Sequence, residues 1–264
     1  MPSWVGRVHR FDFSRLRQQY PNTVGTTLTS GNGHLPDLAF YEVHPEYDYC
    51  WTIEYDVRFY GSWAVFFEEF QNNTADLLGT HIRRYEDQPG WYWWGTLQTP
   101  DGSVAPENRV RAFLPVRRMS RQALSLLMGR DARGWHGHFE GLIPTLLSRY
   151  GLRLEDIGGN GPFTPPPRRS RFYSSFDFQG RGALMYFGSM RFRPALMFWG
   201  THKNFLYHPI KSNAGGKFAS AWNLVGCARY VLKHVLSRQG HGVLRDLIRY
   251  ACAWLPIAKK RSDY

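Results

Sequence analysis

The clearest pattern in the chain is an alternation of apolar and polar residues at 51–59. Every odd position there is apolar and every even position is polar, and this period of two predicts a strand with one buried face. Two carboxylates, Glu54 and Asp56, lie on the polar face, because residues i and i+2 of a strand share a face. The strand is expected to end at Gly61, and Ser62 is the expected N-cap of the helix that follows.

Further along the chain, segments with strand-like patterns alternate with segments with helix-like patterns. Further strands are expected at 76–83, 109–117 and 184–193, and helices are expected after Ser120, from close to Glu140, and at 216–237 and 242–255. The start near Glu140 follows from Pro144, which has no N–H and is tolerated only in the first turn of a helix. Strands that alternate with helices indicate an α/β fold. The Gly- and Pro-rich segment 158–171 is the expected mobile segment or internal boundary.

Composition and charge narrow the range of partners. The 264 residues suffice for one large domain, and a formal charge of +12, from 33 Lys and Arg against 21 Asp and Glu, favours anionic partners. The basic residues are dispersed and no nucleic-acid motif is recognised, so nucleic-acid binding is not the expected function. Three scattered cysteines without a CxxC pair argue against a disulfide framework. No apolar run could span a bilayer and the first twenty residues lack the apolar core of a signal peptide, so a cytoplasmic location is expected.

The pair Glu54 and Asp56 is the first candidate for chemistry. On one face of a strand, their oxygens could approach the same Mg2+ or Mn2+ ion. The alternative is an ordinary solvated strand face on which one carboxylate pairs with Arg58. Acid-x-acid sequences arise often by chance, and on the pattern alone the solvated face is the more common outcome.

A second candidate is Glu140, which follows two imidazoles at the start of its helix. The helix dipole favours an ionised carboxylate there, so Glu140 could act as a general base; alternatively, it only caps its own helix. His136 and His138 form an HxH pair, but an HxH without further ligands is weak evidence for zinc.

Two loops complete the candidate set. Trp91, Trp93 and Trp94 crowd a Pro-Gly loop, where exposed rings would stack on sugar rings and buried ones would only anchor the loop. Farther along, His208 and Lys211 lie within reach of one another and could bind a diphosphate, and His208 could complete a metal site. The alternative for the second loop is a surface segment without a ligand.

These motifs, taken in order, resemble a poorly characterised family of glycosyltransferase-like proteins from bacteria and fungi. The resemblance covers most of the chain from about Gly31 to Lys211. It rests on six segments: WTIEYDVRFYGSW (51–63), FLPVRRMSRQAL (113–124), GWHGHFEGLIPTLL (134–147), DIGGNG (156–161), MRFRP (190–194) and LYHPIK (206–211).

The resemblance implies a GT-A-like fold over 1–264, with a mixed central sheet flanked by helices and a C-terminal helical extension at about 212–264. A nucleotide-sugar donor would bind at the carboxyl ends of the sheet. A GT-A domain opens with an apolar strand and a nucleotide-binding loop before its acid-x-acid motif, whereas the first twenty residues here are basic and polar. If the first strand is absent, the alternative is an inactive relative that does not bind nucleotide.

The resemblance also implies a role for each candidate charge. Glu54 and Asp56, joined by His208, would hold Mn2+ or Mg2+ on the diphosphate of the donor. His208 and Lys211 would neutralise the departing diphosphate. Glu140 would deprotonate the acceptor hydroxyl in an inverting displacement.

The expected function is therefore metal-dependent transfer of a sugar from a nucleotide-diphosphate donor to a glycan or other hydroxyl acceptor, in polysaccharide biosynthesis. Trp91, Trp93, Trp94 and His138 are the candidate acceptor-binding residues. The basic helix near 242–260 is a candidate contact with an anionic membrane. The alternative is a catalytically inactive GT-A-like protein that binds a carbohydrate or a partner. Nucleic-acid binding is a third interpretation, and it predicts an affinity that falls steeply with salt.

Overall fold

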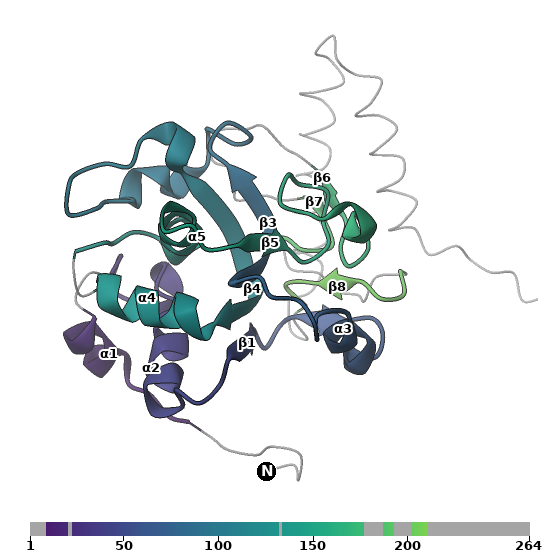
Figure 1. The fold of residues 1–264 in the computed structure, drawn as a ribbon, viewed down its shortest axis with the longest axis horizontal. Coiled ribbons are helices and arrows are strands. Elements are labelled where there is room, and N and C mark those ends of the chain that lie inside the picture. Colours follow the sequence, from purple (N-terminus) through teal and green to yellow (C-terminus); the bar gives the residue numbers. More distant parts are fainter. Residues whose placement is uncertain (1–8, 21–22, 132–133, 177–186, 193–201, 211–264) are drawn as a thin grey trace, which may run out of the picture.

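The computed structural model describes residues 9–20, 23–131, 134–176, 187–192 and 202–210 (Figure 1). The α-helices in this part of the chain are α1 (Phe13–Gln19), α2 (Leu35–Val43), α3 (Trp63–Glu69), α4 (Arg121–Asp131) and α5 (Phe139–Arg149). Its short 3-10 helices are η1 (Leu28–Ser30), η2 (Tyr92–Thr96), η3 (Pro106–Asn108) and η4 (Pro166–Arg168). Its strands are β1 (Tyr49–Ile53), β2 (Arg58–Phe59), β3 (Leu77–Arg84), β4 (Val110–Ser120), β5 (Leu154–Asp156), β6 (Ser175–Phe176), β7 (Phe187–Gly188) and β8 (Leu206–Tyr207). The helices expected at 216–237 and 242–255, and the extension at 212–264, lie outside the described residues.

The main sheet has four strands in the order β1-β4-β3-β5. β4 is antiparallel to both of its neighbours, and β5 is parallel to β3. It follows that β1, β3 and β5 run in one direction and that their carboxyl ends lie at the same edge of the sheet. Two smaller pairs, β2 with β8 and β6 with β7, lie outside it. In open α/β sheets, ligands bind beyond the carboxyl ends of the parallel strands.

Helices cover both faces of this sheet (Figure 1). α5 packs on β4, and α2 and α4 extend the same layer around an apolar cluster that includes Leu38, Leu114 and Leu146. On the other face, α3 and β2 with β8 enclose a second cluster that includes Phe66 and Val116. β4 lies between these layers, and all eleven of its residues are buried. The described fold is therefore mixed α/β.

Several expected elements are confirmed. The strands at 76–83 and 109–117 correspond to β3 and β4, and the helix that starts close to Glu140 is α5. The helix after Ser120 is α4, and the Oγ of Ser120 caps it by accepting a hydrogen bond from the N–H of Ala123 at 3.1 Å. These segments have strong local patterns, which tertiary packing reinforces.

Two other expectations are met only in part. The helix after Ser62 is present as α3, but the side chain of Ser62 makes no capping hydrogen bond. Of the strand expected at 184–193, the structure describes residues 187–192, and within them only the two residues of β7 are a strand.

The single strand expected at 51–59 is wrong, because the chain turns at its centre. β1 ends before Glu54, and β2 pairs with β8 rather than continuing the main sheet. The N–H of Val57 donates to the carbonyl of Glu54 at 3.0 Å, and Nη1 of Arg58 donates to the carbonyls of Tyr55 and Val57. Tyr55, which the alternation predicts to be buried, is 80% exposed. The two carboxylates of the motif therefore flank the tip of a turn.

The segment 158–171, expected to be a mobile segment or an internal boundary, is bonded to the end of β5. The Asp156 carboxylate, at the end of β5, accepts hydrogen bonds from the N–H groups of Gly158 at 2.9 Å and Gly159 at 2.8 Å. The N–H of Ser170 donates to the carbonyl of Gly159 at 2.8 Å. Backbone groups at both ends of the segment are thus bonded to the fold.

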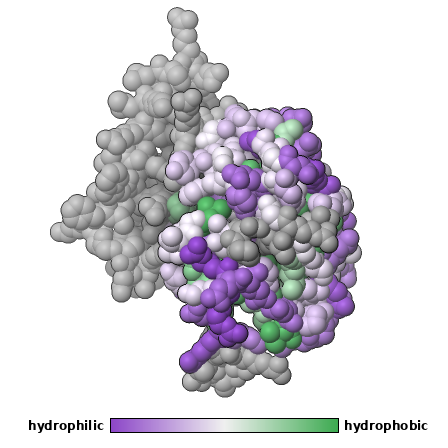
Figure 2. Space-filling view, turned by 90° about the vertical axis from the view of Figure 1, so that its left-hand side faces the viewer, coloured by the Kyte–Doolittle hydropathy of each residue, from purple (hydrophilic) through white to green (hydrophobic). Residues whose placement is uncertain are grey.

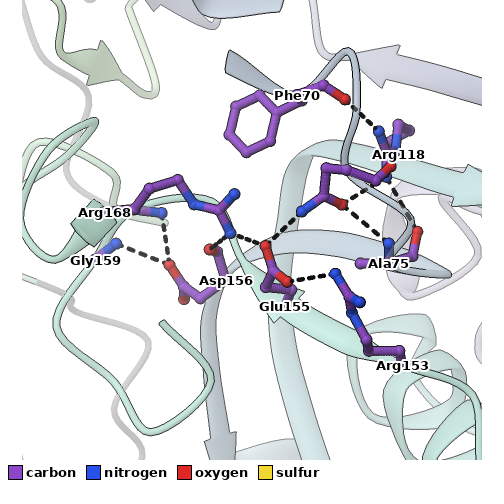
Figure 3. Close-up of polar contacts among 10 residues, drawn as sticks. Phe70, Ala75, Arg118, Arg153, Glu155, Asp156, Gly159 and Arg168 are labelled. Atoms are coloured by element: carbon purple, nitrogen blue, oxygen red, sulfur yellow. Dashed lines mark hydrogen bonds and ion pairs between the residues drawn. The ribbon is translucent and has the colours of Figure 1, made fainter. Parts of the chain in front are cut away.

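A network of charges ties the edge strand β5 to the connection between α3 and β3 (Figure 3). Glu155 forms an ion pair with Arg168 and another with Arg153 at 3.0 Å, and it accepts a hydrogen bond from Nδ2 of Asn73 at 2.6 Å. Arg118 of β4 donates to the carbonyl of Asn73 at 2.7 Å. Glu155, Arg168 and Arg118 are buried and bonded to one another or to backbone and amide oxygens, and Arg153 adds an ion pair from the surface, so the network serves to hold the fold.

The described residues before β1 form helices and loops. α1 is capped by Asp12, which accepts from the N–H of Arg15, and α2 contributes apolar residues to the first cluster. Asp37 of α2 forms a buried ion pair with Arg117 of β4, at 2.6 Å, and accepts from the hydroxyl of Thr52 at 2.9 Å. No strand occurs within the described residues of 9–48.

None of the helices in the described part of the chain combines the length and the apolar composition needed to cross a membrane. On the side of the molecule that Figure 2 presents, the described surface is mostly hydrophilic, and its hydrophobic residues form small separate patches.

Candidate metal centre

Three side chains from two distant segments meet beyond the end of β1. One ligand atom each from Glu54, Asp56 and His208 lies within 4.8 Å of the other two. Nε2 of His208 is 3.5 Å from Oε2 of Glu54 and 3.5 Å from Oδ1 of Asp56. The side chains of Asp56 and His208 are 6% and 7% exposed, whereas that of Glu54 is 42% exposed. Two oxygens and one imidazole nitrogen, open to solvent on one side, are a donor set for a divalent ion.

An irregular point in β4 supports this cluster. Pro115 has no N–H, and its carbonyl accepts from the N–H of Glu54 at 2.8 Å, which fixes the start of the turn. At the other end of the turn, the carbonyl of Asp56 accepts from the N–H of Ile210 at 2.8 Å. The backbone therefore joins the turn to the His208 segment independently of the side chains.

A hydrogen bond to a backbone carbonyl also fixes the imidazole of His208. Its Nδ1 lies 2.6 Å from the carbonyl of Arg191, which can only accept, so Nδ1 carries a proton and Nε2 faces the carboxylates. Burial lowers the pKa of His208, but the bonds to Asp56 and Glu54 outweigh burial and raise it to about 9. Without a metal, the imidazole is therefore a cation between two carboxylates at neutral pH.

Glu140 lies close enough to this cluster to interact with it electrostatically. Burial is the main cause that raises the pKa of Glu140 to about 7, and the negative charge of Glu54 adds to this rise. Three groups lower the pKa and so oppose the rise: Arg111, the N–H of Leu114 and His208. The hydrogen bond from Leu114 is 3.2 Å long, and it comes from the same irregular part of β4 that bonds Glu54. A carboxylate with a pKa near neutrality is suited to accept a proton in a reaction at pH 7.

The helix start at Glu140 differs in detail from the expectation. His138 is the N-cap of α5, and its Nδ1 accepts from the N–H of Glu140 at 3.4 Å, so Glu140 does not cap its own helix. Pro144 lies in the second turn of α5 and cannot donate to the carbonyl of Glu140. The carboxylate of Glu140 instead accepts the hydrogen bond from the N–H of Leu114 in β4.

His138 lies among aromatic rings next to Glu140. The ring of Trp93 stacks on it at 4.6 Å with an interplanar angle of 19°, and Trp91 meets it edge-on at 5.9 Å. Burial, with a contribution from nearby His34, lowers the pKa of His138 to about 3. His138 is therefore a neutral hydrogen-bonding group at any physiological pH.

The tryptophans at 91–94 could either anchor the loop by burial or stack on a sugar ring by exposure, and the structure shows both kinds. Trp91 and Trp94 are each 4% exposed, and Nε1 of Trp94 donates to the carbonyl of Gln88 at 3.0 Å, so these two rings anchor the loop. Trp93 is half-buried, and Tyr92 is 62% exposed. Only Trp93 and its neighbour Tyr92 keep ring surface for a sugar.

The remaining expected residues lie elsewhere. His136 pairs with Gln98 through backbone hydrogen bonds, and among the described residues neither His136 nor His138 forms a group of three or more metal-binding side chains. Lys211, expected to bind the diphosphate, lies outside the described residues.

Sequence reasoning missed Arg111 and His81. Arg111 of β4 is 1% exposed, acts on the charge of Glu140, and stacks over the ring of Trp91 at 5.6 Å. His81 of β3 donates to the carbonyl of Met190 at 2.8 Å, in the segment that holds His208. An arginine inside an otherwise apolar strand pattern was a visible signal; nothing in the local sequence marks His81.

Comparison with known proteins finds a match for one part of the chain. No curated protein and no solved structure matches the chain. A family model does match α1, α2, β1, α3 and both carboxylates of the turn, whereas Glu140 and His208 lie beyond the matched residues. Residues 9–77 are similar to the family described as "Protein of unknown function (DUF3405)".

Proposed function

We propose that the chain transfers a sugar from a nucleoside-diphosphate sugar to a hydroxyl acceptor in a reaction that needs a divalent metal. The observation that carries the proposal is the meeting of Glu54, Asp56 and His208 within 4.8 Å, beside a buried carboxylate, Glu140, with a pKa near 7. The first group fits a metal on an anionic donor, and the second fits a general base for an acceptor.

The donor set supports Mn2+ in preference to Mg2+. Both ions take carboxylate oxygens, but an imidazole nitrogen suits the softer transition metal better than Mg2+. When bound, the ion would stabilise the negative charge that develops on the leaving diphosphate. The orientation of His208, with Nδ1 bonded to a carbonyl, matches the way metal-binding histidines are held.

Glu140 supplies the proton acceptor. In an inverting transfer, the acceptor oxygen bonds to the anomeric carbon while the bond from that carbon to the diphosphate oxygen breaks. The bonding electrons leave with the diphosphate, and the acceptor proton passes to Glu140. The neutral His138 contacts Glu140, and the partly exposed ring of Trp93 stacks on His138, so the two suit an uncharged sugar hydroxyl and the apolar face of its ring.

The GT-A-like identity of the fold is part of the proposal. In its favour are a mixed sheet with helices on both faces, and an acid-x-acid turn directly after the carboxyl end of β1. The described residues of 9–48 do not supply the nucleotide-binding strand that such a fold requires. Nucleotide binding is therefore the decisive measurement.

The test is a thermal-shift titration with Mn2+ and UDP or GDP, with CMP as the monophosphate comparison. We expect a diphosphate to raise Tm only with Mn2+, since a ligand at 100 times its Kd stabilises by about 2.7 kcal/mol. The double variant Glu54→Gln, Asp56→Asn should lose this shift, and Glu107→Gln, an exposed carboxylate outside the cluster, should retain it. No shift with any nucleotide would favour an inactive carbohydrate- or partner-binding protein.

A further inference from the structure

His81 lies inside β3 in a backbone conformation that is unusual for histidine. Its φ is +48°, in the left-handed region, and the residue is 3% exposed. The register of β3 against β4 shifts on both sides of Thr80, and the second shift spans His81. Such a conformation persists in a non-glycine residue only where the surroundings enforce it, and it is common next to functional sites.

Hydrogen bonds hold both the backbone and the ring of His81. Its N–H donates to the hydroxyl oxygen of Tyr173 at 2.7 Å, and that hydroxyl donates to the Asp156 carboxylate, whose oxygens lie 2.9 and 2.8 Å away. Nε2 of His81 is 2.8 Å from the carbonyl oxygen of Met190. A carbonyl only accepts, so Nε2 carries the proton and donates it.

Met190 lies at the centre of the segment that fixes His208. The N–H of His208 donates to the carbonyl of Ser189 at 2.9 Å, and the N–H of Arg191 donates to the carbonyl of His208 at 3.1 Å. Nδ1 of His208 donates to the carbonyl of Arg191 at 2.6 Å. His208 thus forms hydrogen bonds with the backbone of Ser189 and Arg191, on either side of Met190. The carbonyl of Met190 itself accepts a hydrogen bond from His81.

The ring of Phe113 lies next to both imidazoles. Its centroid is 6.1 Å from that of His81 and 5.3 Å from that of His208. His81 and His208 are therefore connected by two routes, a hydrogen-bonded backbone segment and a shared aromatic neighbour.

We infer that His81 is a positioning residue for His208. By holding the carbonyl of Met190, it fixes the 189–191 segment so that Nε2 of His208 faces the two carboxylates of the turn. Partners outside the ligand shell set the direction of a metal-binding imidazole, and their loss typically weakens metal affinity by about 10–100-fold. This role rests on the proposed metal site for its function, although the geometry of His208 can be measured without a metal.

A matched pair of substitutions tests the role. His81→Leu removes the donor, and His81→Gln keeps an N–H donor on an unbranched side chain, so both face a similar backbone strain. We expect His81→Leu to weaken Mn2+ binding about 10–100-fold by isothermal titration calorimetry, and His81→Gln to stay close to the wild type. In the metal-free protein, His81→Leu should lose the NMR cross-relaxation between the rings of His208 and Phe113, and His81→Gln should keep it.

Controls separate positioning from a general loss of stability. Leu127→Ala, in the apolar core at α4, should lower Tm without changing the Mn2+ affinity or the ring contact. If His81→Leu does not fold, Tyr173→Phe removes the acceptor of the His81 N–H and is expected to weaken the same ring contact. An unchanged ring contact in a folded His81→Leu or Tyr173→Phe variant overturns the inference. If the wild type does not bind Mn2+, the proposed function is contradicted but the inference about His81 is not. The contact between the rings of His208 and Phe113 still tests whether His81 positions His208.

Discussion

His208 and Asp56 meet twice, once through their side chains and once through the backbone around them. Nε2 of His208 lies 3.5 Å from Oδ1 of Asp56, and the N–H of Ile210 donates to the carbonyl of Asp56 at 2.8 Å. The side-chain contact can exchange a proton for a metal ion, while the backbone contact keeps the two segments together in either state. This arrangement suits a preformed metal site.

The first prediction concerns the pH dependence of metal binding. Burial lowers the pKa of His208, but the hydrogen bonds that its imidazole donates to Asp56 and Glu54 outweigh burial and raise the pKa to about 9, so a metal ion must displace a proton at neutral pH. We expect Mn2+ affinity to rise by about tenfold per pH unit between about pH 7 and 9 and then to level off. Calorimetry in two buffers with different ionisation enthalpies should reveal release of about one proton per ion. An affinity independent of pH would show that His208 is not a ligand.

The second prediction concerns the proposed role of Glu140 as a general base. Because burial raises its pKa to about 7, the value of kcat/KM should rise with pH and level off above about 7. Glu140→Gln keeps the size of the side chain and removes the base, and we expect a loss of about 10^2–10^4-fold in kcat. Glu107→Gln is the control. Full activity of Glu140→Gln would exclude Glu140 as the base.

The same carboxyl group makes a separate prediction for stability. Its pKa is about 7 in the folded protein against an ordinary value of 4.5, so the folded state binds more protons within this window. The free energy of unfolding should therefore fall by up to about 3 kcal/mol as pH rises from about 4.5 to 7. Glu140→Gln should remove this part of the pH dependence, measured by urea unfolding at several pH values. An identical pH dependence in the variant would contradict the burial of an ionisable group here.

A pair of glycines tests the placement of His138. Gly31 and Gly102 have nearly the same φ, +113° and +111°, but a Cβ on Gly31 would lie 2.8 Å from Cδ2 of His138, whereas a Cβ on Gly102 meets nothing within 4 Å. Both alanine variants carry backbone strain of about 1–2 kcal/mol. Only Gly31→Ala should also displace His138 and raise KM for the acceptor, measured by steady-state kinetics. Equal KM values in the two variants would argue against a role for His138 in acceptor binding.

Two ion pairs of different burial give a prediction about the fold. Asp37 pairs with Arg117 inside the protein, and the side chains are 5% and 2% exposed. The pair of Asp48 with Arg121 is 82% and 49% exposed. Asp37→Ala should cost about 3–5 kcal/mol in chemical unfolding, because it leaves a buried guanidinium without its partner. Asp48→Ala should cost less than about 1 kcal/mol. Similar losses would mean that solvent reaches Arg117.

Local patterns predicted the interior of the fold well. β3, β4, α4 and α5 follow from runs of apolar residues with clear periods and, for α4, from the cap at Ser120. β5 and α2 were not predicted, since a three-residue strand carries no period and α2 follows a loop-like, Gly- and Thr-rich stretch. Their existence depends on packing against β3 and on the ion pair of Asp37 with β4.

The sequence by itself determined the chemistry available, namely the residue types of Glu54, Asp56, Glu140 and His208, and it determined the interior elements β3, β4, α4 and α5. Only the tertiary structure decided how those groups are used. Alternation predicted one strand through Glu54 and Asp56, but pairing of β2 with β8, and bonds to Pro115 and Ile210, make a turn there. Pairing between distant segments carries no local signal, because its energy comes from partners far along the chain. The same long-range packing gives Glu140 and His208 their unusual pKa values.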